Sequence, residues 1–446
     1  MYRGDMLEEP PISGDTAAAI ADSVRALIAR GELRPGEVLP PVRALAARQG
    51  VNRNTVAAAY AALAAAGVVE TRRRGGTVVR GIVPVPGEGA PAPENTINLA
   101  DGNPDPALLP PLPDLQGYEA VLYGAAGIDE SLHHWARRHM LPDTDNSGTL
   151  VLTHGAVDAV ERLLSAHLTR GDAVAVEDPC FLSSIGTFRV NGYRALPVPM
   201  DEHGMTAAGL GAALEAGARA VVCTPRAHNP TGASLTERRA RELRSLLAGH
   251  PHVLVIEDDH FSALARTPYR RITPPESTRW ALVRSVSKFL GPDLRLGLTV
   301  CDADTAARLQ ARLAAATWVS HLLQHLVARV LTDPATPSRL DHAAQAYTRR
   351  RRRLTDALDA HGVPWLAGPD GLNVWLPLAE DAEAAVVEEL AEHGWAVRPG
   401  SLFTLTHRPA IRITTATLAS EHTEALAARL SSTLASINQE PPCSPD

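Results

Sequence analysis

Lys288 is the only lysine among the 43 lysines and arginines of the chain. Both side chains carry a positive charge, but arginine is not deprotonated in proteins, whereas a desolvated lysine can lose its proton and attack a carbonyl carbon. A codon bias toward arginine is the alternative explanation of a single lysine. The surrounding residues must decide between this bias and imine chemistry at Lys288.

An imine-forming lysine needs a phosphate cradle, a carboxylate for a pyridinium nitrogen and a ring to stack on the cofactor. In LTHGAVDAVERLL a strand ends at Gly155 and a helix follows, so the amides of Gly155, Ala156 and Val157 would face an anion. Each feature alone also fits an ordinary turn or strand end, but the set favours a cofactor site. The other candidates are Asp258 in HVLVIEDDHF, Phe181 in VEDPCF, Asn229 in RAHNPTG, and Arg295, which could grip a phosphate.

The elements that must position these residues alternate along the chain. Short apolar strands are expected in GTLVLTHG, DAVAVED, RAVVCTP, HVLVIEDD and WALVRSVSK, with alanine- and leucine-rich helices such as TERRARELRSLLAGH between them. This alternation predicts an α/β fold with a mostly parallel sheet that is covered by helices on both faces.

Residues 81–96, GIVPVPGEGAPAPENT, are rich in proline and glycine, which indicates a linker. It divides the chain into an N-terminal domain, 12–80, and a body, 97–432. The net charge is −7, but residues 1–80 hold 11 arginines and 8 acids, a balance of +3 that leaves −10 for the rest. The two regions are therefore expected to have different functions.

Several classes of protein are not favoured. No apolar run approaches the ~18 residues that a membrane span needs, and the start lacks the layout of a signal peptide. Four cysteines without a CxxC pair predict neither a metal site nor a disulfide framework: Cys180, Cys223, Cys301 and Cys443. A cytoplasmic protein without a metal is expected.

Three helices and a hairpin are predicted in the N-terminal domain. The first helix follows Asp15 or Thr16 and stops at Gly31, with one apolar face of Ile20, Val24, Leu27 and Ile28. The second runs from Pro41 to Gln49, a tight turn follows at 50–52, and the third begins near Arg53 and buries Val56, Tyr60 and Leu63. VVETRRRGGTVV then predicts two short strands around an Arg-Gly turn.

This order is typical of a winged helix-turn-helix, whose recognition helix enters the major groove, and the basic hairpin disfavours a plain helical hairpin. LPPVRALAARQGVNRNTVAAAYAALAAAGVVETRRRGG resembles the GntR family of bacterial repressors. The resemblance implies that Arg43 contacts the phosphate backbone of a double-stranded DNA operator. It places Asn52, Arg53, Asn54 and Thr55 at the start of the recognition helix, and Arg72, Arg73, Arg74 and Gly75 in a wing along an adjacent groove.

The body, over roughly 97–432, resembles fold-type I pyridoxal-phosphate enzymes of the aspartate aminotransferase class, which have a large and a small subdomain. The resemblance implies that Lys288 forms the Schiff base, that Ser285 and Arg295 hold the phosphate, and that Asp258 pairs with the pyridine nitrogen. It further implies that Asn229 bonds the ring oxygen, Phe181 stacks on the ring, Tyr123 reaches the neighbouring subunit's phosphate, and Arg412 in AIRITTATL grips a substrate carboxylate.

Two departures from the family pattern affect this site. Ala156 and Val157 stand where relatives carry Ser or Thr with Gln, so phosphate would be held there by backbone amides alone. His260 stands where relatives carry tyrosine. Imidazole can hydrogen-bond the ring oxygen but is expected to titrate near neutrality. Cofactor binding is expected to survive the exchange of tyrosine for histidine. Efficient transamination is not expected to survive it.

A GntR head joined to such a body resembles the MocR/GabR-type regulators. The resemblance implies a homodimer in which pyridoxal phosphate, or an amino compound that forms an aldimine with it, tunes DNA binding. The leading hypothesis is therefore a pyridoxal-phosphate-dependent transcription regulator. An active aminotransferase with an autoregulatory DNA-binding head is the alternative, and a body that serves only as a dimerisation scaffold does not account for Lys288.

Overall fold

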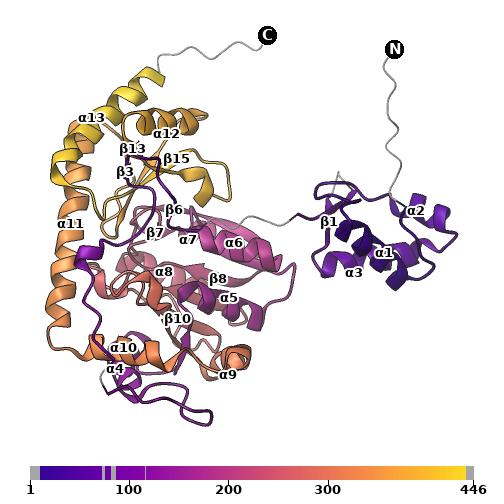
Figure 1. The fold of residues 1–446 in the computed structure, drawn as a ribbon, viewed down its shortest axis with the longest axis horizontal. Coiled ribbons are helices and arrows are strands. Elements are labelled where there is room, and N and C mark those ends of the chain that lie inside the picture. Colours follow the sequence, from indigo (N-terminus) through magenta and orange to yellow (C-terminus); the bar gives the residue numbers. More distant parts are fainter. Residues whose placement is uncertain (1–10, 73–75, 82–86, 116, 438–446) are drawn as a thin grey trace. The chain divides into compact units, whose positions relative to one another are not determined.

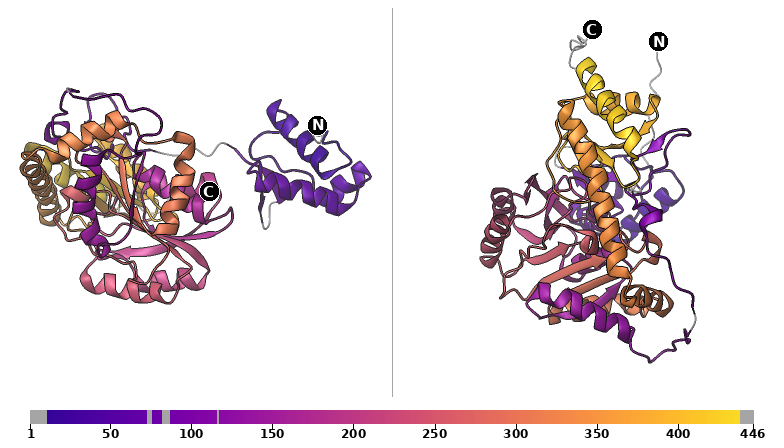
Figure 2. Two further views of the ribbon diagram at one scale, coloured as in Figure 1. Left: turned by 90° about the horizontal axis from the view of Figure 1, so that it is seen from below. Right: turned by 90° about the vertical axis from the view of Figure 1, so that its left-hand side faces the viewer.

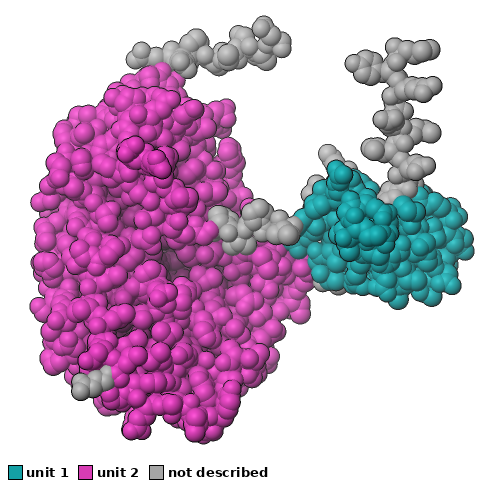
Figure 3. Space-filling model, viewed as in Figure 1, with its two compact units in different colours: residues 1–84 teal, residues 85–446 magenta. Residues whose placement is uncertain are grey.

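A computed structural model describes residues 11–72, 76–81, 87–115 and 117–437. The chain divides into two compact units, residues 1–84 and 85–446 (Figure 3). Residues 87–96, which the sequence assigns to the linker, fall within the second unit. In the described part of the chain, no helix combines the length and the apolar character needed to cross a membrane.

The described residues of unit 1 form three helices and one pair of antiparallel strands, which lie at the indigo end of the chain in Figure 1. Its elements are α1 (Ala17–Ala29), α2 (Val42–Gln49), α3 (Arg53–Ala65), β1 (Val69–Arg72) and β2 (Gly76–Val79). Thr16 caps α1 by accepting from the Ala19 amide at 3.2 Å. Gly50, with φ +65°, ends α2 in the left-handed conformation that glycine adopts without strain.

The core of unit 1 is built from one face of each helix. Ile20, Val24 and Leu27 of α1 pack with Val56, Tyr60 and Leu63 of α3, and Ile28 is only partly buried. β1 and β2 are antiparallel, with Val69 opposite Val79. These features confirm the predicted winged helix-turn-helix and identify Thr16 as the N-cap of the first helix.

Unit 2 is centred on an eight-stranded sheet with the order β4-β11-β10-β9-β8-β5-β6-β7. Its strands are β4 (Thr149–Thr153), β5 (Ala173–Asp178), β6 (Arg194–Asp201), β7 (Gly204–Met205), β8 (Ala218–Cys223), β9 (Leu254–Asp258), β10 (Trp280–Ser285) and β11 (Gly297–Cys301). The five strands from β10 to β6 are parallel, whereas β11 runs antiparallel to both β10 and β4. The sheet is therefore mostly parallel, as predicted.

Helices cover both faces of this sheet. Alternate residues of a strand point to opposite faces, so neighbouring residues of β4 belong to different cores. Val151 packs with α5 (Ala156–His167), α6 (Leu182–Asn191) and α9 (Ala303–Leu313). Leu150 and Leu152 belong to the other core, with α4 (Glu130–Met140), α7 (Ala207–Glu215), α8 (Glu237–Ala248) and α10 (His321–Thr332). This arrangement confirms the layered fold that the alternation predicted.

A smaller subdomain follows the long helix α11 (Thr336–Ala360), which Figure 2 shows as one continuous rod. Its sheet has the order β12-β15-β14, from β12 (Asn373–Pro377), β14 (Arg398–Pro399) and β15 (Ala410–Thr414). It also contains α12 (Ala382–Glu392), α13 (Ser420–Ile437), and β13 (Trp395–Ala396), which pairs with β3 (Ile97–Asn98). Short 3-10 helices lie at Pro106–Leu108, Leu141–Thr144, Ser262–Leu264, Pro292–Leu294, Ala314–Ala316 and Gly400–Phe403.

Candidate functional site

A cavity of about 370 Å³ lies at the carboxyl ends of the parallel strands in unit 2. Open α/β sheets bind their ligands at this edge. Most of the predicted residues around Lys288 are brought together here, although they are scattered over more than a hundred positions, whereas Tyr123, Gly155 and Arg412 are not part of the lining. The lining is Glu88, Asn103, Ala156, Val157, Phe181, Ser183, Thr224, Asn229, Asp258, His260, Ser285, Ser287, Lys288, Pro292 and Arg295.

One wall of the cavity is suited to an anion. Gly155 has φ +94° and directly precedes α5, and no side chain caps that helix. A Cβ at position 155 would lie 2.9 Å from Arg295 Nη2, and the positive φ also favours glycine, so Gly155 allows the guanidinium to approach this helix start. Ser285, at the end of β10, donates to Ser287 Oγ at 2.9 Å. The uncapped amides, the hydroxyls and the guanidinium group together can hold a phosphate.

Two adjacent carboxyl groups at the end of β9 have opposite environments. Asp258 Oδ1 is buried without a hydrogen-bond partner, and burial together with the charges of Asp259 and Glu177 raises the pKa of Asp258 to about 7. Burial also acts to raise the pKa of Asp259, but the charges of Arg284 and Arg226 outweigh it and lower that pKa. Asp258 is therefore the carboxyl that is available to an incoming group.

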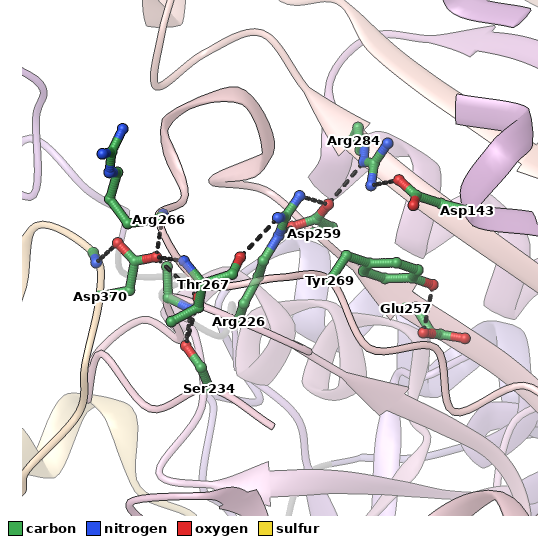
Figure 4. Close-up of polar contacts among 12 residues, drawn as sticks. Asp143, Arg226, Ser234, Glu257, Asp259, Arg266, Thr267, Tyr269, Arg284 and Asp370 are labelled. Carbon is green, nitrogen blue, oxygen red and sulfur yellow. Dashed lines mark hydrogen bonds and ion pairs between the residues drawn. The ribbon is translucent and has the colours of Figure 1, made fainter. Parts of the chain in front are cut away.

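Figure 4 shows the polar network that keeps Asp259 ionised. Arg226 donates to both carboxylate oxygens of Asp259 at 2.8 Å, and Arg284 Nε donates to Oδ2 at 2.7 Å. Arg284 also bonds Asp143 at 2.6 Å, and Arg226 bonds the Thr267 carbonyl at 3.0 Å. Each charge of this network has a partner, so its role is to fix the strand end that presents Asp258.

Lys288 donates from Nζ to the carbonyl oxygen of Gly102 at 2.7 Å. Burial lowers the pKa of Lys288, with Arg412 adding to the effect and Glu88 opposing it. Burial and the Lys288 charge lower the pKa of His260 to about 3. The expectation that His260 titrates near neutrality is therefore wrong. Removal from water and the neighbouring Lys288 cation both disfavour the charged imidazole.

Arg412 on β15 is completely buried and does not itself line the cavity, but it bonds two residues that do, Glu88 and Asn229. Its guanidinium donates to Glu88 Oε1 at 2.6 Å and to Oε2 at 2.8 Å. Asn229 donates from Nδ2 to Glu88 Oε1 at 2.8 Å, and its Oδ1 accepts from Arg412 at 3.0 Å. Glu88 was not predicted from the sequence, since a lone acid in a proline- and glycine-rich stretch has no pattern that marks a site.

Two predicted ring contributions differ in their placement. Phe181, immediately before α6, lines the cavity as expected. Tyr123 is 87% exposed, contacts Trp318 at a ring separation of 5.5 Å, and is absent from the lining of its own chain's cavity. Its assignment to a neighbouring subunit's phosphate stays a prediction.

The predicted DNA-contacting residues that the structure describes lie in unit 1, and most of those with a described side chain are exposed. Arg43 on α2 is exposed, as are Arg53 and Asn54 at the start of α3, whereas Thr55 is half-buried. Asn52 is the N-cap of α3 and accepts from the Asn54 amide at 2.8 Å. Arg72 ends β1, and Arg73, Arg74 and Gly75 lie outside the described residues. The DNA contacts of all these residues stay predictions.

Two family models match the chain. The model of bacterial regulatory proteins of the gntR family matches residues 16–79, and that of aminotransferase class I and II matches residues 115–430. The chain belongs to the aminotransferase class I and II family and carries a GntR-family regulatory domain. This MocR-type regulator thus joins a DNA-binding winged helix-turn-helix to a fold-type I body, as the sequence indicated.

Relatives of this MocR-type regulator extend over nearly the whole chain. The vitamin B6 salvage pathway transcriptional repressor PtsJ of Salmonella typhimurium is 47% identical and covers 94% of this chain and 98% of its own. The pyridoxine biosynthesis transcriptional regulator PdxR of Corynebacterium glutamicum is 27% identical, covering 84% of this chain and 86% of its own. The protein is thus a DNA-binding transcription regulator.

Solved structures match the body of the MocR-type regulator. Kynurenine aminotransferase of Pyrococcus horikoshii aligns with a TM-score of 0.70 at 21% identity, covering 78% of this chain and 92% of that one. The α-aminoadipate aminotransferase LysN of Thermus thermophilus gives 0.67 at 24% identity, with 77% and 93% covered. These likenesses show the fold of the body.

Proposed function

We propose that this regulator binds pyridoxal 5'-phosphate covalently through Lys288 and that cofactor occupancy sets its affinity for a DNA operator. The observation that carries the proposal is the cavity itself. It joins the only lysine of the chain to a buried carboxyl without a partner, Asp258, and to an uncapped helix start beside Arg295. An aldehyde, a pyridine nitrogen and a phosphate are the groups that these three features would receive.

The residues present fit this cofactor. The amides of residues 155–157 would hold the phosphate together with Ser285 and Arg295, and Phe181 would stack on the ring. Asp258, as a carboxylate, would keep the pyridine nitrogen protonated, because a cation beside its carboxyl would offset the burial and the like charges that raise its pKa. The bound cofactor would supply an aldehyde carbon that takes an amine nitrogen. His260, neutral in this cavity, would donate to or accept from the ring oxygen.

The functions of two relatives suggest the biological setting. PtsJ is described as a repressor of vitamin B6 salvage, and PdxR as a regulator of pyridoxine biosynthesis. We infer that the present regulator acts in the cytoplasm, as a homodimer, on genes of vitamin B6 supply. In the dimer, the exposed Tyr123 would reach the partner's phosphate. A response to pyridoxal phosphate itself would let the end product of the pathway set its own supply.

An active aminotransferase remains the second candidate, favoured by the class I and II match and by Lys288 in its cavity. One observation opposes it, because Glu88 already bonds Arg412. The family resemblance opposes it as well, since it implies a tyrosine at the position of His260. Steady keto-acid formation at ordinary enzyme rates, about 1–10³ per second, would support this second function.

The test measures cofactor attachment and DNA binding on the same preparation. Borohydride reduction should fix the cofactor on Lys288, and since no other lysine exists, a mass shift on the peptide that contains it is unambiguous. Operator fragments selected from genomic DNA should then bind apo and loaded protein with affinities that differ about 5–150-fold at fixed salt, equivalent to ~1–3 kcal/mol of coupling. Equal affinities would reject the regulatory part of the proposal.

A further inference from the structure

The Arg412 guanidinium, which is predicted to bind the carboxylate of a ligand, already binds a carboxylate of the chain itself. Glu88 is flanked by two glycines, Gly87 and Gly89, in the segment that leads into the body. Both of its oxygens bond the guanidinium of Arg412, and one also accepts from Asn229. Two parallel N–H···O bonds are the geometry with which arginine recognises a carboxylate, including that of a ligand.

Glu88 occupies this position as an anion. Burial alone would raise the pKa of Glu88, but its hydrogen bond with Arg412 and the charges of Arg412 and Lys288 outweigh burial and lower that pKa. The carboxylate is therefore ionised at neutral pH, like that of an amino acid. Gly102 packs against it so closely that a Cβ there would collide with the carboxylate. The position is thus fitted to Glu88 on several sides.

Only one carboxylate can take both donors of Arg412. An amino acid that places its nitrogen at Lys288 can bind Arg412 through its carboxylate only if it displaces Glu88. A ligand without a carboxylate has no such competitor, because the phosphate cradle and Asp258 lie elsewhere in the cavity. Glu88 therefore discriminates between amines with a carboxylate and amines without one, both of which an aminotransferase-like cavity would otherwise accept.

We propose that Glu88 is an internal carboxylate ligand that blocks the binding of amino acids to Arg412 and leaves the residues that would hold the cofactor accessible. This inference rests on the proposed function, since it concerns the same cavity. Glu88 follows Pro84, the last residue of unit 1, by four positions. Its displacement would release residues 87–89 from Arg412, so an amino acid would act on this part of the chain only at concentrations that outcompete Glu88.

The tether makes Glu88 a strong competitor. A group held by a short flexible segment has an effective concentration in the millimolar range. A free amino acid that relies on Arg412 for affinity should therefore bind at least about tenfold more weakly than it would without Glu88.

The experiment compares a carboxylated amine with its decarboxylated counterpart on the cofactor-loaded full chain. L-alanine and ethylamine are titrated while the absorbance band of the bound cofactor is followed. Glu88→Gln should raise the affinity for L-alanine about tenfold or more and change that for ethylamine far less, since only the charge of Glu88 on Lys288 is shared by the two ligands. Glu94→Gln, the same exchange at an exposed glutamate of the same segment, should change neither. An unchanged L-alanine affinity in Glu88→Gln would overturn the proposal.

A second readout does not depend on the cofactor. A glutamate-specific protease should cut cofactor-free wild type after exposed Glu94 faster than after Glu88, because the docked side chain is held by Arg412. L-alanine added to loaded protein should accelerate only the cut after Glu88. If both bonds of the cofactor-free protein are cut equally fast, Glu88 is not docked and the inference fails, even where covalent attachment at Lys288 succeeds. Failure of that attachment with Glu88 still protected would reject the proposed function alone.

Discussion

The two units of this regulator place their functional residues in opposite environments. In unit 1, Arg43, Arg53 and Asn54 are exposed, and they stand on a core closed by side chains such as Val56 and Leu63. In unit 2, the candidate residues line a cavity at the ends of several strands, and burial shifts the pKa of Asp258, His260 and Lys288.

This difference follows from the two kinds of recognition. DNA is bound by charges and hydrogen bonds that reach outward through water, so many modest contacts add up. A lysine that attacks a carbonyl must first lose its proton, and burial is what lowers its pKa. Substitutions in unit 2 should therefore have large, nearly all-or-none effects, whereas those in unit 1 should be graded.

The largest expected effect is that of Lys288→Arg on covalent cofactor attachment. Arginine keeps the positive charge but does not deprotonate, so no imine forms and borohydride should fix no cofactor on the protein. Mass spectrometry of the reduced protein measures this loss. Binding to non-specific DNA should stay at the wild-type level, because the surface of unit 1 is untouched. Cofactor fixed on the variant would show that Lys288 is not the attachment point.

Asp259→Asn should strongly destabilise unit 2. The exchange leaves Arg226 and Arg284 without their buried anion, and breaking a buried pair in this way typically costs about 3–5 kcal/mol. Urea unfolding of the cofactor-free protein measures the loss as a lower transition midpoint. A midpoint equal to that of the wild type would show that the network in Figure 4 is not needed to hold the strand end.

Asp258→Asn, one residue away, should instead raise the free energy of unfolding at high pH. The folded protein binds more protons at Asp258 than the unfolded chain does between about pH 4 and pH 7, so this group's contribution to the free energy of unfolding falls as the pH rises through that range. An amide removes the buried charge. The cofactor-free variant should gain on the order of 1–4 kcal/mol at pH 8 and clearly less at pH 5. A gain independent of pH would contradict the raised pKa.

The fold of unit 1 could be predicted from the sequence almost element by element. Its signals are local: Thr16 caps a helix three residues before the amide it bonds, Gly50 adopts a left-handed turn, and Val56, Tyr60 and Leu63 repeat at helical spacing. The body was predicted less completely. Strand β6 contains Pro197 and Pro199 and so has few strand signals, and neither it nor the antiparallel β11 was predicted.

The site of unit 2 shows the limit of such reasoning. Phe181, Asp258 and Lys288 could be predicted to line the cavity because each lies at or just after the end of a recognisable strand and the family pattern orders them. Glu88 could not be found, because its role depends on Arg412, which lies 324 positions away in the chain. The neutral state of His260 likewise depends on burial and on the Lys288 charge, and neither is visible in a residue type.

The smallest predicted effect tests the graded behaviour of unit 1. Arg53 is exposed at the start of α3, where the first residues of a recognition helix meet base edges. Arg53→Ala should cost about 1–3 kcal/mol of operator affinity and relax preference at particular bases. Arg43→Ala, the matched loss of one exposed arginine on α2, should weaken binding to all sequences and reduce the salt dependence, as expected for a phosphate contact. Titrations of both variants at several salt concentrations, on operator and scrambled DNA, separate the two roles. Cofactor attachment should be unchanged in both, which confirms that the body is intact. If Arg53→Ala weakens operator and scrambled DNA equally, Arg53 contacts phosphate and the base-reading assignment is wrong.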